Sequence, residues 1–90
     1  MNILEEAAEI IYGDREKTYG SPSVNLQRIA EQWSLYLKQK HSANVELRIE
    51  DVCAMMVLLK FCRQMHSPKR DNLVDAVGYL ALIERCEDGQ

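Results

Sequence analysis

We expect no signal peptide in this sequence, and it has no apolar run long enough to cross a membrane. Its most apolar stretch, residues 50–64, falls short of the roughly 20 residues that a membrane-spanning helix needs. The three cysteines include no close pair, and the two histidines stand apart, which argues against a zinc site. We therefore expect a cytoplasmic protein with reduced thiols and no contact with membranes.

The sequence also lacks an excess of positive charge. Its 14 acidic and 11 basic residues give a net charge of −3, whereas broad binding of duplex DNA needs a basic surface. No nucleophile-elbow motif with a histidine partner is present, and the Gly-Lys-Ser/Thr spacing of a P-loop is missing as well. These absences argue against broad DNA binding and nucleophilic catalysis, but they leave a local phosphate site open.

What the sequence does contain is helical periodicity in four segments. We predict helices at residues 2–12, about 23–40, about 49–66 and about 71–86, with a start signal at Pro22 and end signals at Gly13 and Pro68. Residues 45–49 alternate as a strand would, but a strand of five residues without a partner is weakly indicated. We therefore expect one domain, residues 1–90, that is all-α and forms a compact bundle of about four helices.

The third of these segments is apolar on almost every side, which is typical of a helix buried by its neighbours. Cys53 and Cys62 both lie in it and are therefore expected in the core. A chain of this length buries only a modest share of its surface, so it cannot easily cover a helix that is apolar on almost every side. The third segment therefore also predicts a homo-oligomer, in which a second chain would help to cover it. Lys60 and Arg63 are neighbours on one edge of the helix and give it a positive charge there.

Asp75, on the last predicted helix, has apolar neighbours and two interpretations. A carboxylate in such surroundings has to be paired, bound to a metal or protonated. The first interpretation is a structural ion pair with Lys60, Arg63 or Arg70. The second is a role in binding a ligand or a metal ion, and Asp75 is our candidate metal ligand.

Two groups of residues are candidates for binding phosphate. Lys60 and Arg63 offer an ammonium and a guanidinium, although they also suit a purely structural role beside Asp75. The segment 14–20 places basic residues between two glycines, which let a backbone approach a ligand closely, and a solvated turn is the alternative. Tyr79 is a candidate for stacking on a base or, alternatively, a core aromatic like Trp33. The ligand-binding candidates are Arg15, Lys17, Tyr19, Asn25, Lys60, Arg63, Asp75 and Tyr79.

Three segments, in this order, resemble a family of small phage and prophage proteins of unassigned function. They read REKTYG from residue 15, EDVCAMMVLLKFCR from residue 50 and DNLVDAVGYLAL from residue 71. Members of that family carry similar R-x-x-T-Y-G, E-D-V-x-x-M-M-x-x-L-K-x-x-R and D-x-x-x-D-x-x-G-Y segments. The resemblance covers about residues 13–83 and implies a phage origin, hence a bacterial host cell, rather than an activity.

The last segment is also similar, more distantly, to the MazG-like all-α nucleoside triphosphate pyrophosphohydrolases. Those enzymes hold magnesium between E-x-x-E on one helix and E-x-x-D on another, and they oligomerise. Asp75 stands in the aspartate place, but Asn72 stands where a glutamate is expected. Glu6 and Glu9 have the E-x-x-E spacing, but they lie on the first predicted helix. This resemblance implies magnesium as a cofactor and a nucleotide as the substrate.

Two classes of function follow from these patterns. The first is a protein that binds a nucleotide or another phosphorylated small molecule, at most a reduced MazG-like pyrophosphohydrolase. Basic residues with one acid suit phosphate binding better than two-metal chemistry. The second is a phage accessory or counter-defence protein that acts by contact with a host protein or by sequestering a host nucleotide signal.

Overall fold

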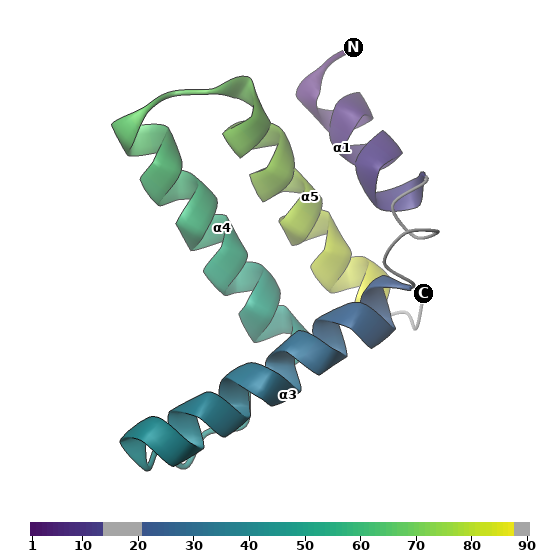
Figure 1. Cartoon of the computed structure of the whole chain (residues 1–90). Coiled ribbons are helices and arrows are strands. Elements are labelled where there is room, and N and C mark those ends of the chain that lie inside the picture. Colours follow the sequence, from purple (N-terminus) through teal and green to yellow (C-terminus); the bar gives the residue numbers. More distant parts are fainter. Residues whose placement is uncertain (14–20, 88–90) are drawn as a thin grey trace.

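The computed structural model describes residues 1–13 and 21–87. Within these residues the chain forms four helices and no strand: α1 (Ile3–Tyr12), α3 (Pro22–His41), α4 (Ile49–His66) and α5 (Arg70–Glu87) (Figure 1). The all-α prediction is confirmed, and the observed helix ends fall at or next to the predicted positions. In this described part of the chain, no helix has the length and apolarity needed to cross a membrane.

The helices begin where side chains can satisfy the free backbone N–H groups of a first turn. Asn2 and Glu5 form a capping box, in which the Glu5 N–H donates to Asn2 Oδ1 at 2.8 Å and the Asn2 N–H donates to Glu5 Oε1 at 3.2 Å. Ser21 is the N-cap of α3. At the start of α4 the Arg48 N–H donates to Asp51 Oδ2 at 2.8 Å. Local sequence therefore sets these three helix starts.

The antiparallel pair α4 and α5 is the centre of the fold (Figure 1). Helix α1 lies along α5, on the side away from α4, and α3 crosses the end of the pair where α4 begins and α5 finishes. The principal extents are 45 × 33 × 21 Å, so the molecule is flat. Because α3 covers one end of the pair, much of α4 has only α5 beside it among the described helices.

Two arginines of α5 hold the ends of α1. Near the start of both helices, Arg70 Nη2 lies 3.0 Å from Glu6 Oε2. Near their far ends, Arg85 Nη1 donates a hydrogen bond to the Ile11 carbonyl oxygen, and the Arg85 guanidinium lies 4.8 Å from the centre of the Tyr12 ring. Arg85 thus neutralises a helix C-terminus while itself being buried.

The buried apolar side chains form a small core in two parts. One part joins α3 to α4 through Leu26, Ala30, Val52 and Cys53. The other joins α1 to α5 and comprises Ala7, Ile11 and Val74. Among the residues described, the largest side chains with less than 2% exposure are Val52, Val74 and Cys53, so no large aliphatic or aromatic side chain is completely enclosed.

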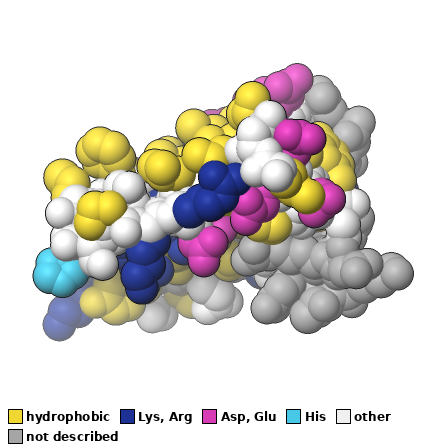
Figure 2. Space-filling view, turned by 90° about the horizontal axis from the view of Figure 1, so that it is seen from above, with side chains coloured by type: hydrophobic (Ala, Val, Ile, Leu, Met, Phe, Trp, Pro, Cys, Tyr) yellow, Lys and Arg dark blue, Asp and Glu magenta, His cyan; other side chains and the backbone are white. Residues whose placement is uncertain are grey.

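The prediction that α4 is buried on all sides is wrong for the single chain. Val52 and Cys53 are its buried residues, whereas Leu58, Phe61 and Met65 are exposed. The prediction that Cys62 is buried is also wrong, since this thiol is exposed while Cys53 is buried. The physical reason is the arrangement of the other helices, which cover one side of α4 and leave the opposite side open. Figure 2 accordingly shows many hydrophobic side chains along the upper side of the view.

Candidate functional site

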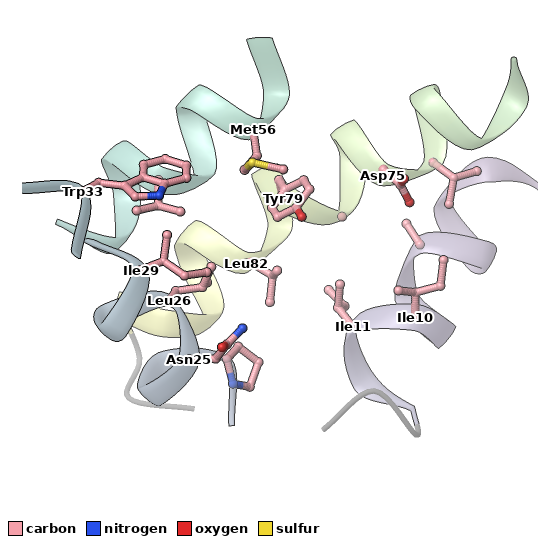
Figure 3. A pocket seen from close by; sticks show the side chains of 15 residues that line it. Ile10, Ile11, Asn25, Leu26, Ile29, Trp33, Met56, Asp75, Tyr79 and Leu82 are labelled. Atoms are coloured by element: carbon pink, nitrogen blue, oxygen red, sulfur yellow. The ribbon is translucent and has the colours of Figure 1, made fainter. Parts of the chain in front are cut away.

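A cavity of about 260 Å³ lies between the two parts of the core. All four helices contribute to its lining, so it exists only when α1 and α3 are both in place beside the α4–α5 pair. Figure 3 shows it from close by. Most lining residues are apolar, and those labelled in the figure are Ile10, Ile11, Asn25, Leu26, Ile29, Trp33, Met56, Asp75, Tyr79 and Leu82.

Two aromatic residues lie in the wall of the cavity. Trp33 comes from α3 and Tyr79 from α5, and both are half-buried and pack against the core. Both rings therefore pack against the core, and each also borders the open space of the cavity. The flat face of such a ring can stack on an aromatic ligand.

Polar side chains reach the cavity from two sides. Asn25 lies in the first turns of α3 and Asp75 on α5, and Figure 3 shows them at opposite ends of the cavity. Each offers hydrogen-bonding atoms to a wall that is otherwise mostly apolar, and the Tyr79 hydroxyl is a third such group. A few convergent polar groups in an apolar wall are the usual arrangement of a small-molecule site.

The Asp75 carboxylate is paired with Lys60. Lys60 Nζ lies 2.8 Å from Asp75 Oδ2, and the two side chains are 15% and 29% exposed. Of the three partners considered from the sequence, Lys60 is therefore the one that the structure shows, while Arg70 pairs with Glu6. The ion pair does not use all of the carboxylate, because each ionised oxygen can accept two hydrogen bonds. A role of Asp75 in ligand binding stays a prediction.

The remaining predicted site residues are placed as follows. Arg63 is exposed, one turn after Lys60, and does not line the cavity. Arg15, Lys17 and Tyr19 lie outside the described residues. The structure thus brings Asn25, Asp75 and Tyr79 to one cavity, and Lys60 contacts Asp75. Arg63 is not among the residues that line the cavity.

Asn72, which stands in the place of a MazG-like glutamate, is used in the connection between α4 and α5. Its Nδ2 donates to Gln64 Oε1 at 3.2 Å, and the same oxygen accepts the Lys69 N–H at 3.0 Å. Within residues 1–13 and 21–87, no group of three or more His, Cys, Asp or Glu side chains could hold a metal ion. The described residues therefore do not form the larger carboxylate group of a MazG-like magnesium site, and Asp75 as a metal ligand stays a prediction.

Gly78 lies in the wall of the cavity, where α5 passes α1. A Cβ atom added to this residue would lie 3.5 Å from Ile11 Cγ2, which is an ordinary van der Waals distance. Close packing of α1 therefore does not require a glycine here. The open space that the missing side chain leaves belongs to the cavity.

Sequence reasoning did not anticipate the contribution of α1. Ile10 and Ile11 form one wall of the cavity, and Arg85 holds the helix end that carries them. One signal was present, since Arg85 follows Gly78 by seven residues, or about two helical turns, and so lies on the same side of α5. An arginine on that side has to find a partner among the residues packed there.

The Cys53 thiol is the titratable group that burial changes most clearly. Burial raises the pKa of Cys53 from 9.0 to about 11, and the neighbouring Cys86 adds to the effect. Cys53 packs in the core part shared by α3 and α4, beside the cavity residue Val52. The thiol is therefore protonated at neutral pH and acts as a small apolar core group.

The fold and the cavity together define a small all-α protein with a ligand-sized internal space. The chain belongs to the family described as domain of unknown function DUF6378, whose profile matches residues 2–87. The match covers all three segments on which the resemblance to phage proteins was based.

Two relatives are phage proteins. The chain is 40% identical over 88 residues to the Gene 55 protein of Mycobacterium phage L5, covering 97% of this chain and 53% of the relative. It is 38% identical over 85 residues to the Gene 55 protein of Mycobacterium phage D29, covering 93% and 52%. The chain thus spans about half the length of these relatives. No solved structure matches it. The resemblance to phage proteins is confirmed, and the distant similarity to MazG-like enzymes is not.

Proposed function

We propose that the protein binds a nucleotide, or a related ligand with a heteroaromatic ring and a phosphate, with the ring in the cavity between α1, α3, α4 and α5. The observation that carries this proposal is the combination, in one cavity, of apolar walls, two aromatic rings and the separated polar groups Asn25 and Asp75. The membership in a family with phage relatives is compatible with a ligand drawn from the nucleotide pool of a host cell.

The size of the cavity decides which part of a nucleotide it can enclose. Its volume of about 260 Å³ is just below the range of about 300–1,000 Å³ that encloses drug-sized ligands. It suits a single ring system better than a whole nucleoside triphosphate. The phosphates would therefore lie outside the cavity.

The polar groups suit the edge of a nucleobase. The Asp75 carboxylate can accept a hydrogen bond from a ring N–H or an amino group, and the Asn25 amide can both donate and accept. Trp33 or Tyr79 can stack on the ring, which typically contributes about 1–3 kcal/mol per base. These three kinds of contact recognise a base without any metal ion.

Lys60 and Arg63 are the described cations best placed to meet a phosphate. Lys60 contacts Asp75 and so stands at the edge of the cavity lining, and Arg63 follows one turn later with its side chain exposed. Since exposed charge interactions are screened by salt, the phosphate part of the affinity should fall as ionic strength rises. The base part of the affinity should change little.

We propose binding of a nucleotide, rather than its hydrolysis, as the primary function. In the structure Asp75 contacts a lysine, and Asn72 takes part in the connection between α4 and α5. Among the residues that the structure describes, neither belongs to a group of three or more metal-ligating side chains. A reduced MazG-like pyrophosphohydrolase remains the enzymatic form of the proposal, and incubation with nucleoside triphosphates and magnesium, followed by product analysis, tests it separately.

Calorimetry with a panel of nucleosides and their mono-, di- and triphosphates tests the proposal. We expect wild-type protein to bind at least one base-containing ligand, and Trp33→Ala to weaken that binding. Tyr36→Ala is the matched control, because Tyr36 is on the same helix but is exposed and outside the cavity. It should bind as the wild type does.

Arg63→Ala separates the phosphate from the base. It should weaken binding of a phosphorylated ligand by about 1.5–3 kcal/mol, the usual range for a hydrogen bond to a charged group, and leave binding of the parent nucleoside unchanged. If wild-type protein binds no ligand of the panel at millimolar concentration, the nucleotide proposal is wrong. Action through contact with a host protein would then be the better-supported function.

A further inference from the structure

The α4–α5 pair carries exposed apolar residues on both helices. On α4, Leu58, Phe61 and Met65 recur at helical spacing and are 63%, 62% and 68% exposed. On α5, Leu73 and Leu80 lie two turns apart and are 40% and 55% exposed. We call these five residues the hairpin face.

The five residues lie on one side of the pair. The contact of Lys60 with Asp75, and that of Gln64 with Asn72, mark the sides on which α4 and α5 meet. Phe61 is the residue after Lys60, and Leu73 is the residue after Asn72. One residue corresponds to a rotation of about 100° around the helix axis. In both helices this turn leads away from the side that lines the cavity. The hairpin face and the cavity are therefore on opposite sides of the α4–α5 pair.

The hairpin face is large for a monomer. With these exposed fractions, the five side chains present on the order of 500 Å² of apolar surface, which is near the upper end of the range for the largest patch on a monomeric protein. A standard interface buries about 800 Å² on each partner. The remaining area would have to come from residues around these five.

Exposed acidic residues predominate at one end of the hairpin and exposed basic residues at the other. At the end where α4 begins and α5 finishes, Glu50 and Glu84 are exposed, together with Arg48. At the turn between α4 and α5, Lys69 and Arg70 are exposed, together with Asp71. A second copy, related by a twofold axis that lies in the interface and is perpendicular to the helices, would bring the mainly acidic end of one chain to the mainly basic end of the other.

We propose that the hairpin face is covered by the hairpin face of a second copy of this chain, with α4 antiparallel to α4 of the partner. The pairing is self-complementary, because a twofold axis places each apolar residue of the face opposite an apolar residue of the partner's face, and the mainly acidic end of each chain at the mainly basic end of the other. It also completes the core, since the described part of one chain encloses no large aliphatic or aromatic side chain fully. The inference does not depend on the proposed nucleotide binding, because the cavity lies on the other side of the pair.

Sedimentation or light scattering at micromolar concentration tests the interface. We expect wild-type protein to have twice the chain mass of 10.4 kDa and Leu58→Glu to have the mass of one chain. Leu4→Glu is the matched control, because Leu4 is a leucine of similar exposure, 69%, on α1 and outside the hairpin face. It should keep the mass of two chains.

Charge reversal tests the antiparallel arrangement. Glu84→Lys and Lys69→Glu should each raise the dimer dissociation constant, and the two together in one chain should restore it. A wild-type mass of one chain would overturn the proposal whether or not the variants fold, and would leave the hairpin face to a foreign protein. A folded Leu58→Glu protein, shown by its helical circular dichroism, that stays dimeric would also overturn it. Failure of the double variant to restore the dissociation constant would contradict the antiparallel pairing.

Discussion

Lys60 Nζ lies 2.8 Å from Asp75 Oδ2, and the same aspartate lines the cavity between the four helices. One carboxylate therefore takes part both in joining α4 to α5 and in the surface that a ligand would meet. A ligand that donates a hydrogen bond to Asp75 would share the carboxylate with the lysine. Stability without ligand and affinity for ligand are thus linked at this residue.

The first prediction is that Asp75→Ala lowers the free energy of unfolding by about 1–3 kcal/mol, because it leaves the largely buried Lys60 ammonium without its partner. The expected loss is smaller than for a fully buried ion pair, because the Lys60 and Asp75 side chains are partly exposed to solvent. Urea denaturation without ligand measures the loss. The double variant Lys60→Met/Asp75→Leu should lose less than Asp75→Ala, since it leaves no unpaired charge. Equal losses in the two variants would contradict the structural role of the pair.

Local signals in the sequence predicted the helices well. Gly13, Pro22 and Pro68 mark ends or beginnings that the structure shows at or next to the expected positions. Such signals act within one turn of the chain, so they can be recognised without knowledge of the fold. The Lys60–Asp75 pair was also among the predicted partners, because a carboxylate between apolar residues needs a nearby cation.

The tertiary arrangement was less predictable. The apolar pattern of residues 52–61 indicates surfaces that need to be covered, but it does not say which helix, or which chain, covers them. For this reason Phe61 and Cys62 were expected in the core and are exposed. The cavity depends on how α1 packs against α5, which involves Ile11, Gly78 and Arg85, residues far apart in the sequence.

The second prediction concerns Gly78. Gly78→Ala should raise the free energy of unfolding by up to about 1 kcal/mol, because alanine is the better helix former and its Cβ would be at an ordinary distance from Ile11. The same methyl group would enter the cavity and should weaken ligand binding. Thermal unfolding and calorimetry, run on the same samples, measure the two effects.

Gly13→Ala provides the contrast for this experiment. A Cβ added to Gly13, next to the end of α1, would collide with the Glu9 carbonyl oxygen. This variant should therefore be less stable than the wild type. If Gly78→Ala is destabilised as well, α1 and α5 pack more tightly in solution than is indicated by the 3.5 Å between an added Cβ at Gly78 and Ile11 Cγ2.

The third prediction compares the two arginines that hold α1. Arg85→Met should lower the free energy of unfolding by about 1.5–3 kcal/mol, since it removes a buried, charged hydrogen bond to the Ile11 carbonyl oxygen. Arg70→Met should lower it by less than about 1 kcal/mol, because its ion pair with Glu6 is partly exposed. Hydrogen exchange of the α1 amides would show whether the loss in Arg85→Met is local to α1. Equal effects of the two substitutions would mean that burial of Arg85 does not matter for the docking of α1.

The fourth prediction concerns the reactivity of the thiols. In the Leu58→Glu variant, which is expected to be a single chain, Cys62 is exposed and should react with a thiol reagent at pH 8, whereas Cys53 is buried and should react only when the protein opens. Mass spectrometry after a short exposure distinguishes the two sites. Labelling of both cysteines at the same rate would contradict the placement of Cys53 in the core.

The last prediction is that Cys53 makes the protein less stable at alkaline pH. Its folded-state pKa is about 11, against 9.0 for the ordinary thiol, so below pH 9 the thiol is protonated in both the folded and the unfolded chain. Between these two values the unfolded chain loses the proton first, and the free energy of unfolding falls as the pH rises. From pH 7 to pH 10 the loss of unfolding free energy due to this thiol should be about 1.4 kcal/mol, which corresponds to one pH unit above the unfolded-state pKa.

Urea denaturation at both pH values should therefore show a smaller decrease in the free energy of unfolding for Cys53→Ala than for wild type. Cys62→Ala, which retains Cys53, should decrease as much as wild type, and an equal decrease in all three proteins would contradict the raised pKa.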